Sequence, residues 1–518
     1  MKHACLCWLL ACCLLLASCA APANSSRDVE LAQPVHISIA FWNVGDELVG
    51  DPLQRYVEEK FNIVFDHVNV TYDNYTERLQ QLSASDELPD ILANDILGTS
   101  AYESWITQGK IRAIPKELTE YPLLEAYLDQ PYNERFKRDN GSYYMIPRLT
   151  YSEESLWALD RCIMVRKDWL EKLDLSLPHS WGEFEALLRG FVQGDPDGNG
   201  KADTGGLVAT HLNTLEAIYL PLFAELSNTE RGWMYEDGQW MPSYCSKRTA
   251  PALEKVRQLY QEGLLAKEFV YLSTAEAIKA FANGKYGAIC GQYYKVVNYM
   301  SDNGRQDEIA DVVAILPTWP ADDGNTYRFT TSLHWSESYF GANVSNEKMK
   351  LILSLYNWLL SDEFARIYEY GLEGVDWTWQ AGKATPLGSV SPLRKYPSLA
   401  LLAQLVEWRQ DEGYVTNDYN ILTYGAAQLR YAQEMLAWFR EHAQRVNYNF
   451  DIVFMSLPSK NSLVYNSVVQ DEMVKVIVGQ ESALTAWPAA LQRLRETTTL
   501  SQAITDVTRE AEREGIKP

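Results

Sequence analysis

Residues 35–61 read VHISIAFWNVGDELVGDPLQRYVEEKF, and this stretch decides the fold class. Residues 35–41 alternate apolar and polar side chains, as a half-buried β-strand does. Asp51 and Pro52 then have the pattern of a helix cap and a first helical residue, and apolar side chains follow at helical spacing as far as Phe61. The stretch therefore predicts a strand followed by a helix.

The same alternation continues along the chain. Residues 63–70 predict a second strand, 74–82 a helix and 88–93 a short strand. Such a β-α-β-α order is typical of an α/β fold, in which a parallel sheet carries helices on both faces. After GSYYMIPR at residues 141–148, an apolar strand over 156–165 indicates the beginning of a second lobe. Later segments predict strands at 287–290 and 312–316 and helices at 349–360, 363–370, 399–408, 429–446 and 470–478.

Size and composition limit the class of protein. With 518 residues, 47% of them hydrophobic, the chain can bury a large core and should divide into at least two domains. The formal net charge is −23 and the acidic residues are scattered, so nucleic acid is excluded as a partner and a highly anionic ligand is disfavoured. Sixteen Trp and 31 Tyr supply aromatic faces of the kind that pack on the apolar C–H faces of sugar rings.

The first residues, MKHACLCWLLACCLLLASC, have the features of an export signal. Lys2 provides the positive charge, and residues 8–16 provide an apolar run that is too short to span a bilayer. The order Leu-Ala-Ser-Cys at residues 16–19 resembles a bacterial lipobox. We therefore expect residues 1–18 to be a signal peptide and Cys19 to carry lipid. Ordinary secretion, with cleavage near Ala20 or Ala21, is the alternative.

Residues 19–33 are expected to form a lipid anchor and flexible tether. The segment is polar and without periodicity, and at this length it reaches roughly 20 Å. The protein is then anchored through lipid alone at the extracytoplasmic face of a bacterial cell membrane. The cysteines of the remaining chain, Cys162, Cys245 and Cys290, are too few and too widely spaced for a disulfide framework, so we expect small buried apolar residues.

Residues 195–206 read DPDGNGKADTGG and have the spacing of a cation-binding loop. Asp195, Asp197, Asn199 and Asp203 occupy loop positions 1, 3, 5 and 9, the carbonyl of Lys201 occupies position 7, and a glycine occupies position 6. Position 12 is glycine instead of the bidentate glutamate of an EF-hand, so further ligands must come from elsewhere or from water. The pattern predicts a structural calcium site, and the alternative is a turn held by side chains that bond to nearby backbone amides.

The segment DWLEKLDLSLPHSWGEFEALLRGFVQGDPDGNGKADTGG, residues 168–206, resembles the entry to the second lobe of extracellular solute-binding proteins of family 1. These are the substrate-binding components of ABC sugar importers. The chain is most similar to the group that includes the large Gram-positive lipoproteins and the alginate oligosaccharide binders. Further similarity lies in FANGKYGAI (281–289), SDEFARIYEYGLEGVDW (361–377) and DEMVKVIVG (471–479). In the alginate binders a similar loop holds calcium, with an acidic residue where this chain has Thr204.

The resemblance implies an α/β fold of the periplasmic-binding-protein type II, with two discontinuous lobes joined by a hinge. We place the N-terminal lobe at residues 34–148 plus 318–372 and the C-terminal lobe at residues 149–317 plus 373–518. It also implies the function: a monomer that captures an oligosaccharide between its lobes and delivers it to the transmembrane subunits of an ABC permease, without catalysis.

Ligand contacts are expected from the loops at the carboxyl ends of strands, where they face the crevice between the lobes. In the first lobe Trp42 and Asn43 follow the first strand, and Asn94 and Asp95 follow the third. Trp335 lies in HWSESYF, a segment that the resemblance places back in the first lobe. A packing role is the alternative for each of these residues.

The remaining candidates lie in the second lobe and near the predicted crossings. Tyr293 and Tyr294 follow a strand and a glycine, where maltose-type relatives carry a sugar-stacking aromatic residue. Trp377 and Trp379 lie just after Gly374, near a predicted crossing. Arg148 offers a hydrogen-bond fork for hydroxyls or a carboxylate. Packing is again the alternative for each residue.

Signals for catalysis are missing from the sequence. It contains no Gly-x-Ser-x-Gly, no His-Glu-x-x-His, no phosphate-binding glycine loop and no dinucleotide fingerprint. Paired carboxylates could still occur in space, so a lipoprotein glycoside hydrolase or lyase is a competing hypothesis. Two more hypotheses keep the fold: a ligand sensor that signals through a membrane partner, and a binder of acidic oligosaccharides.

Overall fold

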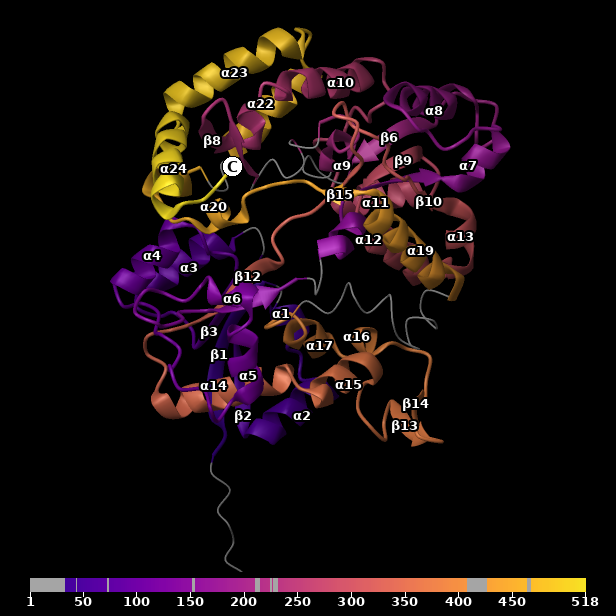
Figure 1. Ribbon diagram of the computed structural model, residues 1–518. Helices are drawn as coiled ribbons and strands as arrows, with labels where there is room; N and C mark the ends of the chain where they lie inside the picture. The colour runs from indigo at the N-terminus through magenta and orange to yellow at the C-terminus, as the bar shows by residue number, and fades with distance from the viewer. Residues whose placement is uncertain are drawn as a thin grey trace, which may run out of the picture.

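The computed structural model describes residues 33–42, 44–71, 74–150, 154–209, 215–223, 226, 232–407, 426–463 and 467–518. They form an α/β fold of two lobes, shown one above the other in Figure 1. Each lobe is built around its own sheet and its own large hydrophobic cluster. In the described part of the chain, every helix is too short or too polar to cross a membrane.

The lower lobe in Figure 1 contains a five-stranded sheet in the order β2-β1-β3-β12-β4. Its strands are β1 (Val35–Trp42), β2 (Ile63–Val70), β3 (Ile91–Asn94), β4 (Ile146–Leu149) and β12 (His334–Phe340). β1 pairs in parallel with β2 and β3, which confirms the parallel opening predicted from the sequence. β12 runs antiparallel between β3 and β4, so a segment from far along the chain completes this sheet.

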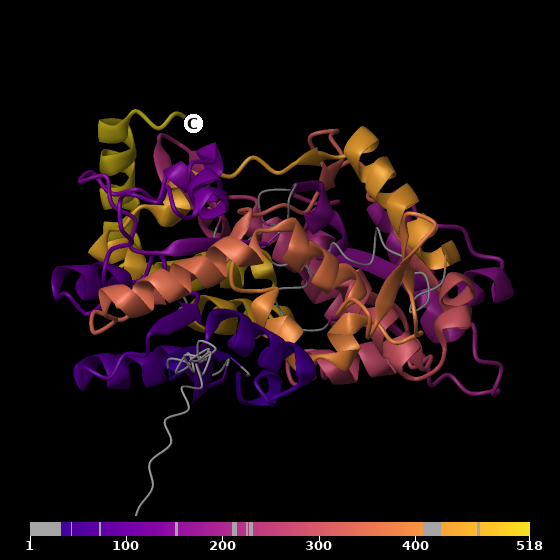
Figure 2. The same cartoon turned by 90° about the horizontal axis from the view of Figure 1, so that it is seen from below.

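Helices cover the first sheet on both faces. The helix α2 begins where the sequence predicts, because the Asp51 carboxylate accepts hydrogen bonds from the backbone N–H groups of Leu53 and Gln54. Figure 2 shows α14 lying across this lobe beside the indigo N-terminal helices. The helices of the lobe are α1 (Val44–Glu47), α2 (Pro52–Phe61), α3 (Tyr75–Ala84), α4 (Ser100–Thr107), α5 (Pro122–Leu128), α6 (Pro131–Glu134), α14 (Asn346–Leu359), α15 (Asp362–Tyr370), α16 (Pro392–Lys395) and α17 (Pro397–Leu402).

The upper lobe contains a four-stranded sheet in the order β10-β5-β9-β6. Its strands are β5 (Cys162–Arg166), β6 (Gly205–Ala209), β9 (Tyr286–Gly291) and β10 (Val313–Ile315). β5 is antiparallel to both of its neighbours, and β6 is parallel to β9. The helices around it are α7 (Lys167–Lys172), α8 (Trp181–Gln193), α9 (Glu216–Tyr219), α10 (Thr249–Gln261), α11 (Thr274–Ala282), α12 (Tyr293–Asp302), α13 (Ile309–Val312), α19 (Ala426–His442), α22 (Ser467–Val478), α23 (Ala483–Thr497) and α24 (Leu500–Glu514).

Shorter elements complete the molecule. The 3-10 helix η1 (Glu154–Leu159) precedes β5, and the strands β11 (Tyr327–Arg328) and β15 (Gln444–Arg445) pair in parallel beside it. Two hairpins, β7 (Trp233–Glu236) with β8 (Gln239–Pro242) and β13 (Trp377–Gln380) with β14 (Lys383–Pro386), lie outside the main sheets. The remaining short helices are η4 (Ser243–Cys245), η5 (Gln306–Glu308), α20 (Phe450–Phe454) and α21 (Pro458–Asn461).

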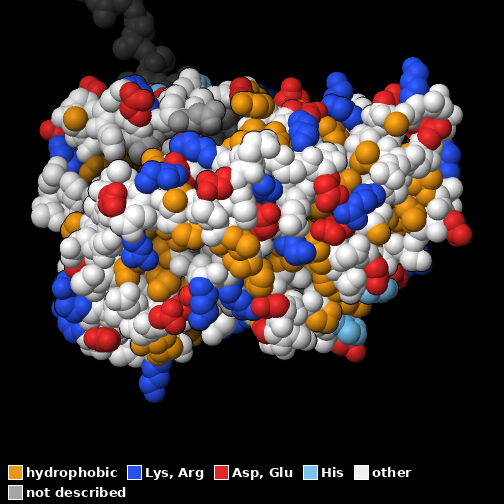
Figure 3. Space-filling model, turned by 90° about the horizontal axis from the view of Figure 1, so that it is seen from above, with side chains coloured by type: hydrophobic (Ala, Val, Ile, Leu, Met, Phe, Trp, Pro, Cys, Tyr) orange, Lys and Arg blue, Asp and Glu red, His pale blue; other side chains and the backbone are white. Residues whose placement is uncertain are grey.

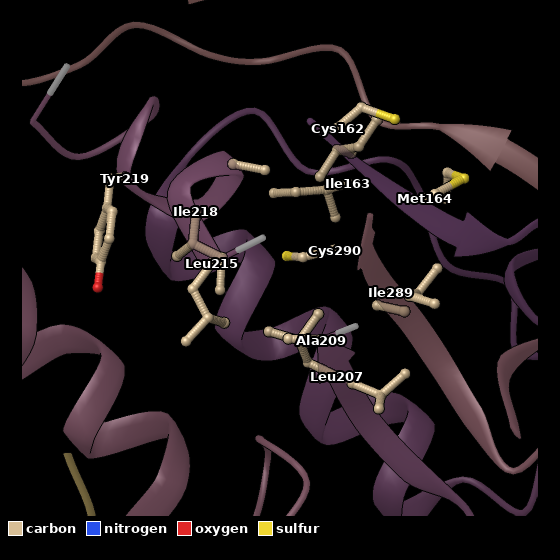
Figure 4. Close-up of a cluster of buried hydrophobic side chains, with 14 of the residues drawn as sticks. Cys162, Ile163, Met164, Leu207, Ala209, Leu215, Ile218, Tyr219, Ile289 and Cys290 are labelled. Carbon is tan, nitrogen blue, oxygen red and sulfur yellow. The ribbon is translucent and has the colours of Figure 1, made fainter. Parts of the chain in front are cut away.

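The three cysteines of the body are buried side chains without disulfides, as predicted. Figure 4 shows Cys162 and Cys290 among Ile163, Ile289 and other apolar side chains of the second-lobe core. Burial raises the pKa of the Cys245 thiol to about 12. These thiols therefore behave as small apolar packing residues.

The hydrophobic clusters show where the chain changes lobe. The first-lobe cluster includes Tyr396 to Val406, a segment that we predicted for the second lobe. It packs there because the Asp51 carboxylate binds the backbone N–H and hydroxyl of Ser398, and because the Leu149 N–H donates to the carbonyl of Val406. Conversely, Trp319 lies in the second-lobe cluster, although we predicted that the first lobe resumes at residue 318. The chain therefore returns to the first lobe only after residue 319. Residues beyond 372 still belong to the core of that lobe.

Acidic and basic side chains are interspersed on the face seen from above in Figure 3, without a single broad basic patch on that face. This distribution matches the scattered charges of the sequence.

Candidate ligand-binding site

The strands of the first sheet bring several predicted residues to one edge. β1 and β3 are parallel and end at Trp42 and Asn94, while the antiparallel β12 begins at the same edge with His334, which pairs with Leu149 of β4. α1 follows this edge and lies on the side that faces the second lobe (Figure 1). Trp42, Asn94, Asp95, Arg148 and Trp335 therefore lie at this edge of the first sheet. Asn43 lies outside the described residues.

Two of these residues, Trp42 and Trp335, form a stacked aromatic pair. Their ring centroids are 5.4 Å apart and their planes differ by 27°. Trp42 is 5% exposed, whereas Trp335 is only half-buried. Tyr75 meets the Trp42 ring edge-on at 5.7 Å, so the pair continues into the first-lobe core. Trp335 therefore supplies the exposed part of this aromatic surface.

Arg148 packs against the aromatic pair. Its guanidinium carbon lies 4.8 Å from the Trp335 ring centroid and 5.6 Å from that of Trp42. The Nε–H donates to the Trp335 carbonyl at 2.7 Å, and Nη1 donates to the Gln404 side chain at 3.2 Å. The side chain is 1% exposed. The Nε–H and one Nη1–H of the fork that we predicted for a ligand thus donate to protein groups.

A β-bulge sets the direction of Trp335. The register of β12 against β4 shifts between His334 and Glu337, and Ser336 has a φ of 68°. A residue other than glycine in this left-handed region carries a local energetic cost, and such positions concentrate at functional sites. A bulge re-aims the side chain beside it. Here the residue beside the strained position is Trp335.

A buried carboxyl holds the turn that follows β3. Glu337 accepts hydrogen bonds from the backbone N–H groups of Ile96 and Leu97, both at 3.3 Å, and from the Tyr339 hydroxyl at 2.6 Å. Burial, together with the nearby charge of Asp95, raises the pKa of Glu337 to about 8. The turn that carries Asp95 is therefore held by a carboxyl that is largely protonated at neutral pH.

The same edge contains buried oxygen atoms that lack hydrogen-bond donors within the described part of the chain. Asn94 donates from Nδ2 to the Ala40 carbonyl, but its Oδ1 accepts no hydrogen bond there. Glu47 on α1 also has a buried oxygen, Oε2, without a hydrogen-bond partner among the described residues. Burial and, as the smaller cause, the nearby charge of Asp46 raise the pKa of Glu47 to about 8. A buried polar atom without a hydrogen-bond partner is costly, so these atoms favour a ligand with hydroxyl groups, which can both donate and accept.

Our sequence reasoning missed Glu47 and Glu337. Glu47 stands only five positions after Trp42, so the signal was its place in the loop that follows the first strand. Glu337 lies inside the strand segment HWSESYF, where a carboxylate flanked by two serines in an otherwise aromatic segment was the available signal. Neither signal indicates which partners the carboxyl has in the fold.

The second lobe offers a polar edge where β9 ends and β5 begins. Gly291 pairs with Cys162, and next to this pair the Gln292 Nε2 donates to Asp160 at 3.1 Å. The Oε1 of Gln292 is buried and accepts no hydrogen bond from the described residues. Arg161 forms an ion pair with Asp160. Gln292 and Asp160 are therefore polar groups of this edge that the sequence had not singled out.

The two predicted tyrosines differ in placement. Tyr293 is 1% exposed and packs in the second-lobe core, and this burial raises the pKa of its hydroxyl well above the ordinary value. Tyr294 is partly buried against the same core, with the Lys295 ammonium 5.9 Å from its ring centroid. Only Tyr294 keeps part of its ring accessible.

Trp377 and Trp379 lie on the β13–β14 hairpin, which Figure 1 places beside α15 and α16, away from β1 and β12. Trp377 is 2% exposed and donates from Nε1 to the Gly371 carbonyl. Trp379 meets Trp377 edge-on at 5.3 Å and is 53% exposed. The structure therefore brings these two tryptophans to each other and not to the edge of the first sheet.

The aspartate-rich loop follows α8 and is exposed. Asp195 accepts hydrogen bonds from the N–H groups of Asn199 and Gly200, both at 3.0 Å. The Asn199 Nδ2 links Asp197 at 2.7 Å and Asp203 at 3.1 Å. Among the residues that the structure describes, no group of three or more His, Cys, Asp or Glu is arranged to hold a metal.

The donor types of the loop nevertheless fit a hard cation. Carboxylate, amide and carbonyl oxygens are the ligands that calcium takes, and glycine in the left-handed region at residue 200, with a φ of 77°, gives the tight turn. In the structure the Asn199 amide donates hydrogen bonds to the carboxylates of Asp197 and Asp203. A bound divalent ion would hold the same two carboxylates together through its positive charge. The Lys201 carbonyl remains the expected backbone ligand.

A cavity of about 300 Å³ lies where α20 of the second lobe meets the first lobe. Phe454 packs edge-on against Phe136 at 5.2 Å, and Arg135 forms an ion pair with Asp451 at 3.1 Å. The Arg138 guanidinium in its wall is held by two hydrogen bonds to Glu103. The cavity thus adjoins a contact between the lobes, and two of its three basic residues are paired within the protein.

Comparisons with known proteins agree with this architecture. No protein-family model matches the chain. The chain is 25% identical over 349 residues to lipoprotein LipO and 23% identical over 334 residues to the polygalacturonan/rhamnogalacturonan-binding protein YtcQ, both of Bacillus subtilis (strain 168). It is 27% identical over 224 residues to the fructooligosaccharide ABC transporter substrate-binding protein FusA of Streptococcus pneumoniae serotype 4. These alignments cover 65%, 62% and 42% of this chain. They cover 65%, 64% and 41% of the relatives, less than two thirds of each.

Solved structures share the fold over nearly the whole chain. FusA in complex with kestose has a TM-score of 0.69 at 17% identity and covers 93% of this chain and 99% of its own. The alginate-binding protein AlgQ2 without calcium ion has a TM-score of 0.67 at 17% identity, with 92% and 98% covered. An EF-hand mutant of FusA, at 18% identity, has a TM-score of 0.68. These structures confirm the α/β fold of two lobes that the resemblance implied.

Proposed function

We propose that this chain is an extracytoplasmic substrate-binding lipoprotein of an ABC importer, which captures an oligosaccharide between its lobes without chemical change. The observation that carries the proposal is the stacked Trp42–Trp335 pair at the edge of the first sheet, beside buried oxygens that lack donors among the described residues. The similarity to FusA and YtcQ, two proteins named for the saccharides they bind, supports the same class of ligand.

The chemistry of this edge suits a sugar. Apolar C–H faces of a pyranose or furanose ring can pack on the half-buried face of Trp335. Sugar hydroxyls can donate to Asn94 Oδ1 and can form a hydrogen bond with the Glu47 carboxyl, which removes the cost of leaving these buried polar atoms unpaired. Asp95 and Trp42 lie beside these groups, and Gln292 and Tyr294 are the corresponding candidates of the second lobe.

Closure of the two lobes would convert binding into a signal for the permease. A ligand that touches both sheet edges binds the closed form better than the open form, and that difference in affinity shifts the equilibrium toward closure. The transmembrane subunits of the importer are then the partner of the closed monomer. The lipid on Cys19, a residue outside the described range, would keep the protein close to them.

The aspartate-rich loop has a structural role in this proposal. Calcium bound by Asp195, Asp197, Asn199, Asp203 and the Lys201 carbonyl would fix an exposed turn between α8 and β6. The loop belongs to the second lobe, and its residues accept hydrogen bonds from one another, so the ion would stabilise that lobe without contacting the sugar.

Titration calorimetry with purified mature protein and a panel of oligosaccharides tests the proposal. We expect saturable binding of at least one oligosaccharide, a decrease in the radius of gyration on binding and an unchanged ligand at the end of the experiment. Binding of peptides or metal chelates with no binding of any saccharide would contradict the proposal. Release of shortened products from a polysaccharide would support a glycoside hydrolase or lyase instead.

A further inference from the structure

Exposed apolar side chains gather on one hairpin of the molecule, β13–β14, and on its flanks. Val375, Trp379, Leu387 and Val390 are each more than half exposed. The other strongly exposed large apolar side chains of the described residues lie singly on different helices, strands and loops. Single exposed apolar residues are ordinary on a protein surface, whereas several around one element indicate a contact surface.

The hairpin is fixed to the body of the protein. Trp377 is buried and donates from Nε1 to the Gly371 carbonyl at 3.1 Å. The buried Asp376 carboxylate forms an ion pair with Lys395. Trp379 packs edge-on against Trp377, with 5.3 Å between the ring centroids. The exposed side chains are thus presented on a rigid base, which lowers the entropy that is lost when they dock.

The hairpin lies near the point where the chain enters the first lobe. Val35, at the start of β1, donates its N–H to the carbonyl of the residue that caps the end of α2. Lys60 on α2 forms an ion pair with Glu363 at the start of α15. At the other end of α15, about 14 Å away, Tyr370 packs against Trp377 at 5.8 Å. The start of β1 and the hairpin therefore belong to the same end of the molecule, the lower end in Figure 1.

The segment before β1 sets how far this end can lie from a membrane. The proposed lipid is on Cys19, outside the described residues, and residues 19–33 reach roughly 20 Å. A bilayer that holds the lipid therefore lies within reach of the hairpin. The tether also raises the effective concentration of the hairpin at the bilayer surface, so that a weak contact becomes populated.

The hairpin segment carries almost no charge. Between Trp377 and Leu393, Lys383 is the only charged residue, although 22% of the whole chain is charged and its net charge is −23. An anionic membrane surface repels an acidic protein, and this segment adds no negative charge to that repulsion. Lys383, beside the turn of the hairpin, is attracted to anionic headgroups. The charge pattern therefore fits a lipid surface.

We infer that the β13–β14 hairpin contacts the interface of the lipid bilayer, with Trp379 and Leu387 buried at the level of the headgroups. An indole suits this depth, because its ring is apolar while its N–H can still donate to a polar group. The hairpin then forms a second point of attachment and holds the first lobe in one orientation on the membrane. The inference goes beyond the proposed function and takes from it only the lipid on Cys19.

Vesicle flotation tests the contact in the absence of the anchor. The Cys19→Ala protein should bind vesicles of phosphatidylethanolamine and phosphatidylglycerol. Adding Trp379→Ser and Leu387→Ser to it should weaken that binding at least about tenfold, because less apolar area leaves water. Leu484→Ser changes a similarly exposed leucine on α23 of the second lobe and should bind like its parent. No binding by the parent, or equal binding by all three proteins, would overturn the inference.

Fluorescence quenching locates the tryptophan in the lipid-anchored protein. Bromine atoms on lipid acyl chains quench an indole that touches them, so the wild-type protein should lose part of its tryptophan emission in brominated vesicles. Trp379→Phe should lack this quenchable fraction, and Trp181→Phe, on α8 of the second lobe, should retain it. Quenching that persists in Trp379→Phe would place another tryptophan at the membrane and overturn the inference.

Further readouts separate the possible outcomes. The double variant should keep the melting temperature of its parent, because both changed side chains are more than half exposed. If it does not fold, Leu387→Ser alone is compared with Leu484→Ser. Absence of vesicle binding, together with a cross-link from position 379 to the transmembrane subunits, would assign the hairpin to the permease and overturn the lipid contact. Oligosaccharide binding is measured without vesicles, so its failure would overturn the proposed function and not the hairpin contact.

Discussion

At the scale of single residues, Trp335 should contribute most to binding, since it is the exposed member of the aromatic pair. We expect Trp335→Ala to weaken oligosaccharide binding at least about tenfold, because the stacking surface for the sugar ring is lost. Calorimetry measures the effect. Trp181→Phe, on α8 of the second lobe, is the matched control and should leave affinity unchanged. Equal losses in the two variants would mean that the effect comes from the scaffold.

The buried carboxyls predict how stability depends on pH. The pKa of Glu337 is raised from 4.5 to about 8, so between these values the folded state holds a proton that the unfolded state releases. Its contribution to stability is therefore fully present below pH 4.5 and is lost as the pH rises through about 8. The loss is at most about 1.4 kcal/mol for each pH unit in that window. Glu47 acts in the same direction.

Thermal unfolding of Glu337→Gln between pH 4.5 and 8.5 measures this contribution. We expect a smaller fall in the melting temperature with pH than in the wild-type protein, because the amide does not ionise. Asp86→Asn, an exposed aspartate in the first lobe, is the control and should keep the wild-type slope. A variant slope equal to that of the wild type would show that Glu337 does not hold the proton.

At the scale of elements, the loop between α8 and β6 should respond to calcium. We expect calcium to raise the melting temperature and a chelator to reverse the effect, because an ion that binds only the folded state stabilises it by about 2.7 kcal/mol at a hundredfold excess over Kd. Asp203→Asn should abolish the response, since it removes one carboxylate of the set. Asp237→Asn, in the exposed turn between β7 and β8, should retain the calcium response. A calcium response that is the same in all three proteins would place the ion elsewhere.

The elements themselves were largely readable from the sequence because their signals are local. Ser180 and Glu183 have the Ser-x-x-Glu spacing of a capping box, and the Ser180 hydroxyl caps α8 by accepting a hydrogen bond from the Glu183 N–H. The Glu183 side chain accepts a hydrogen bond from the His179 N–H. The bulge in β12 had no sequence signal, since Ser336 offers neither glycine nor asparagine at a position that needs a positive φ.

At the scale of the whole molecule, the proposed lipid anchor makes Cys19 decisive for location. Cys19→Ala should appear in the culture medium and bind its oligosaccharide with unchanged affinity, because the anchor is separate from the two lobes. Fractionation and calorimetry on the released protein measure this. Cys13→Ala, which changes a cysteine within the expected signal peptide, should remain on the membrane. If Cys19→Ala also remained there, the anchor would be a different residue.

The sequence by itself determined the α/β class, the parallel order of β1, β2 and β3 and the burial of Cys162, Cys245 and Cys290. It could do so because periodicity, caps and composition are properties of neighbouring residues. Only the tertiary structure decided which aromatic residues meet. It stacks Trp42 on Trp335 and leaves Tyr293 in a core, although nothing local distinguishes these side chains.

The same limit applies to Arg148. The sequence shows an arginine after a proline, equally suited to a ligand or to the protein. The structure directs it to a carbonyl 187 residues away, through a bulge and a register that arise only when β12 enters the sheet beside β4. Contacts of this kind depend on long-range strand pairing, which the residues on either side of Arg148 do not encode.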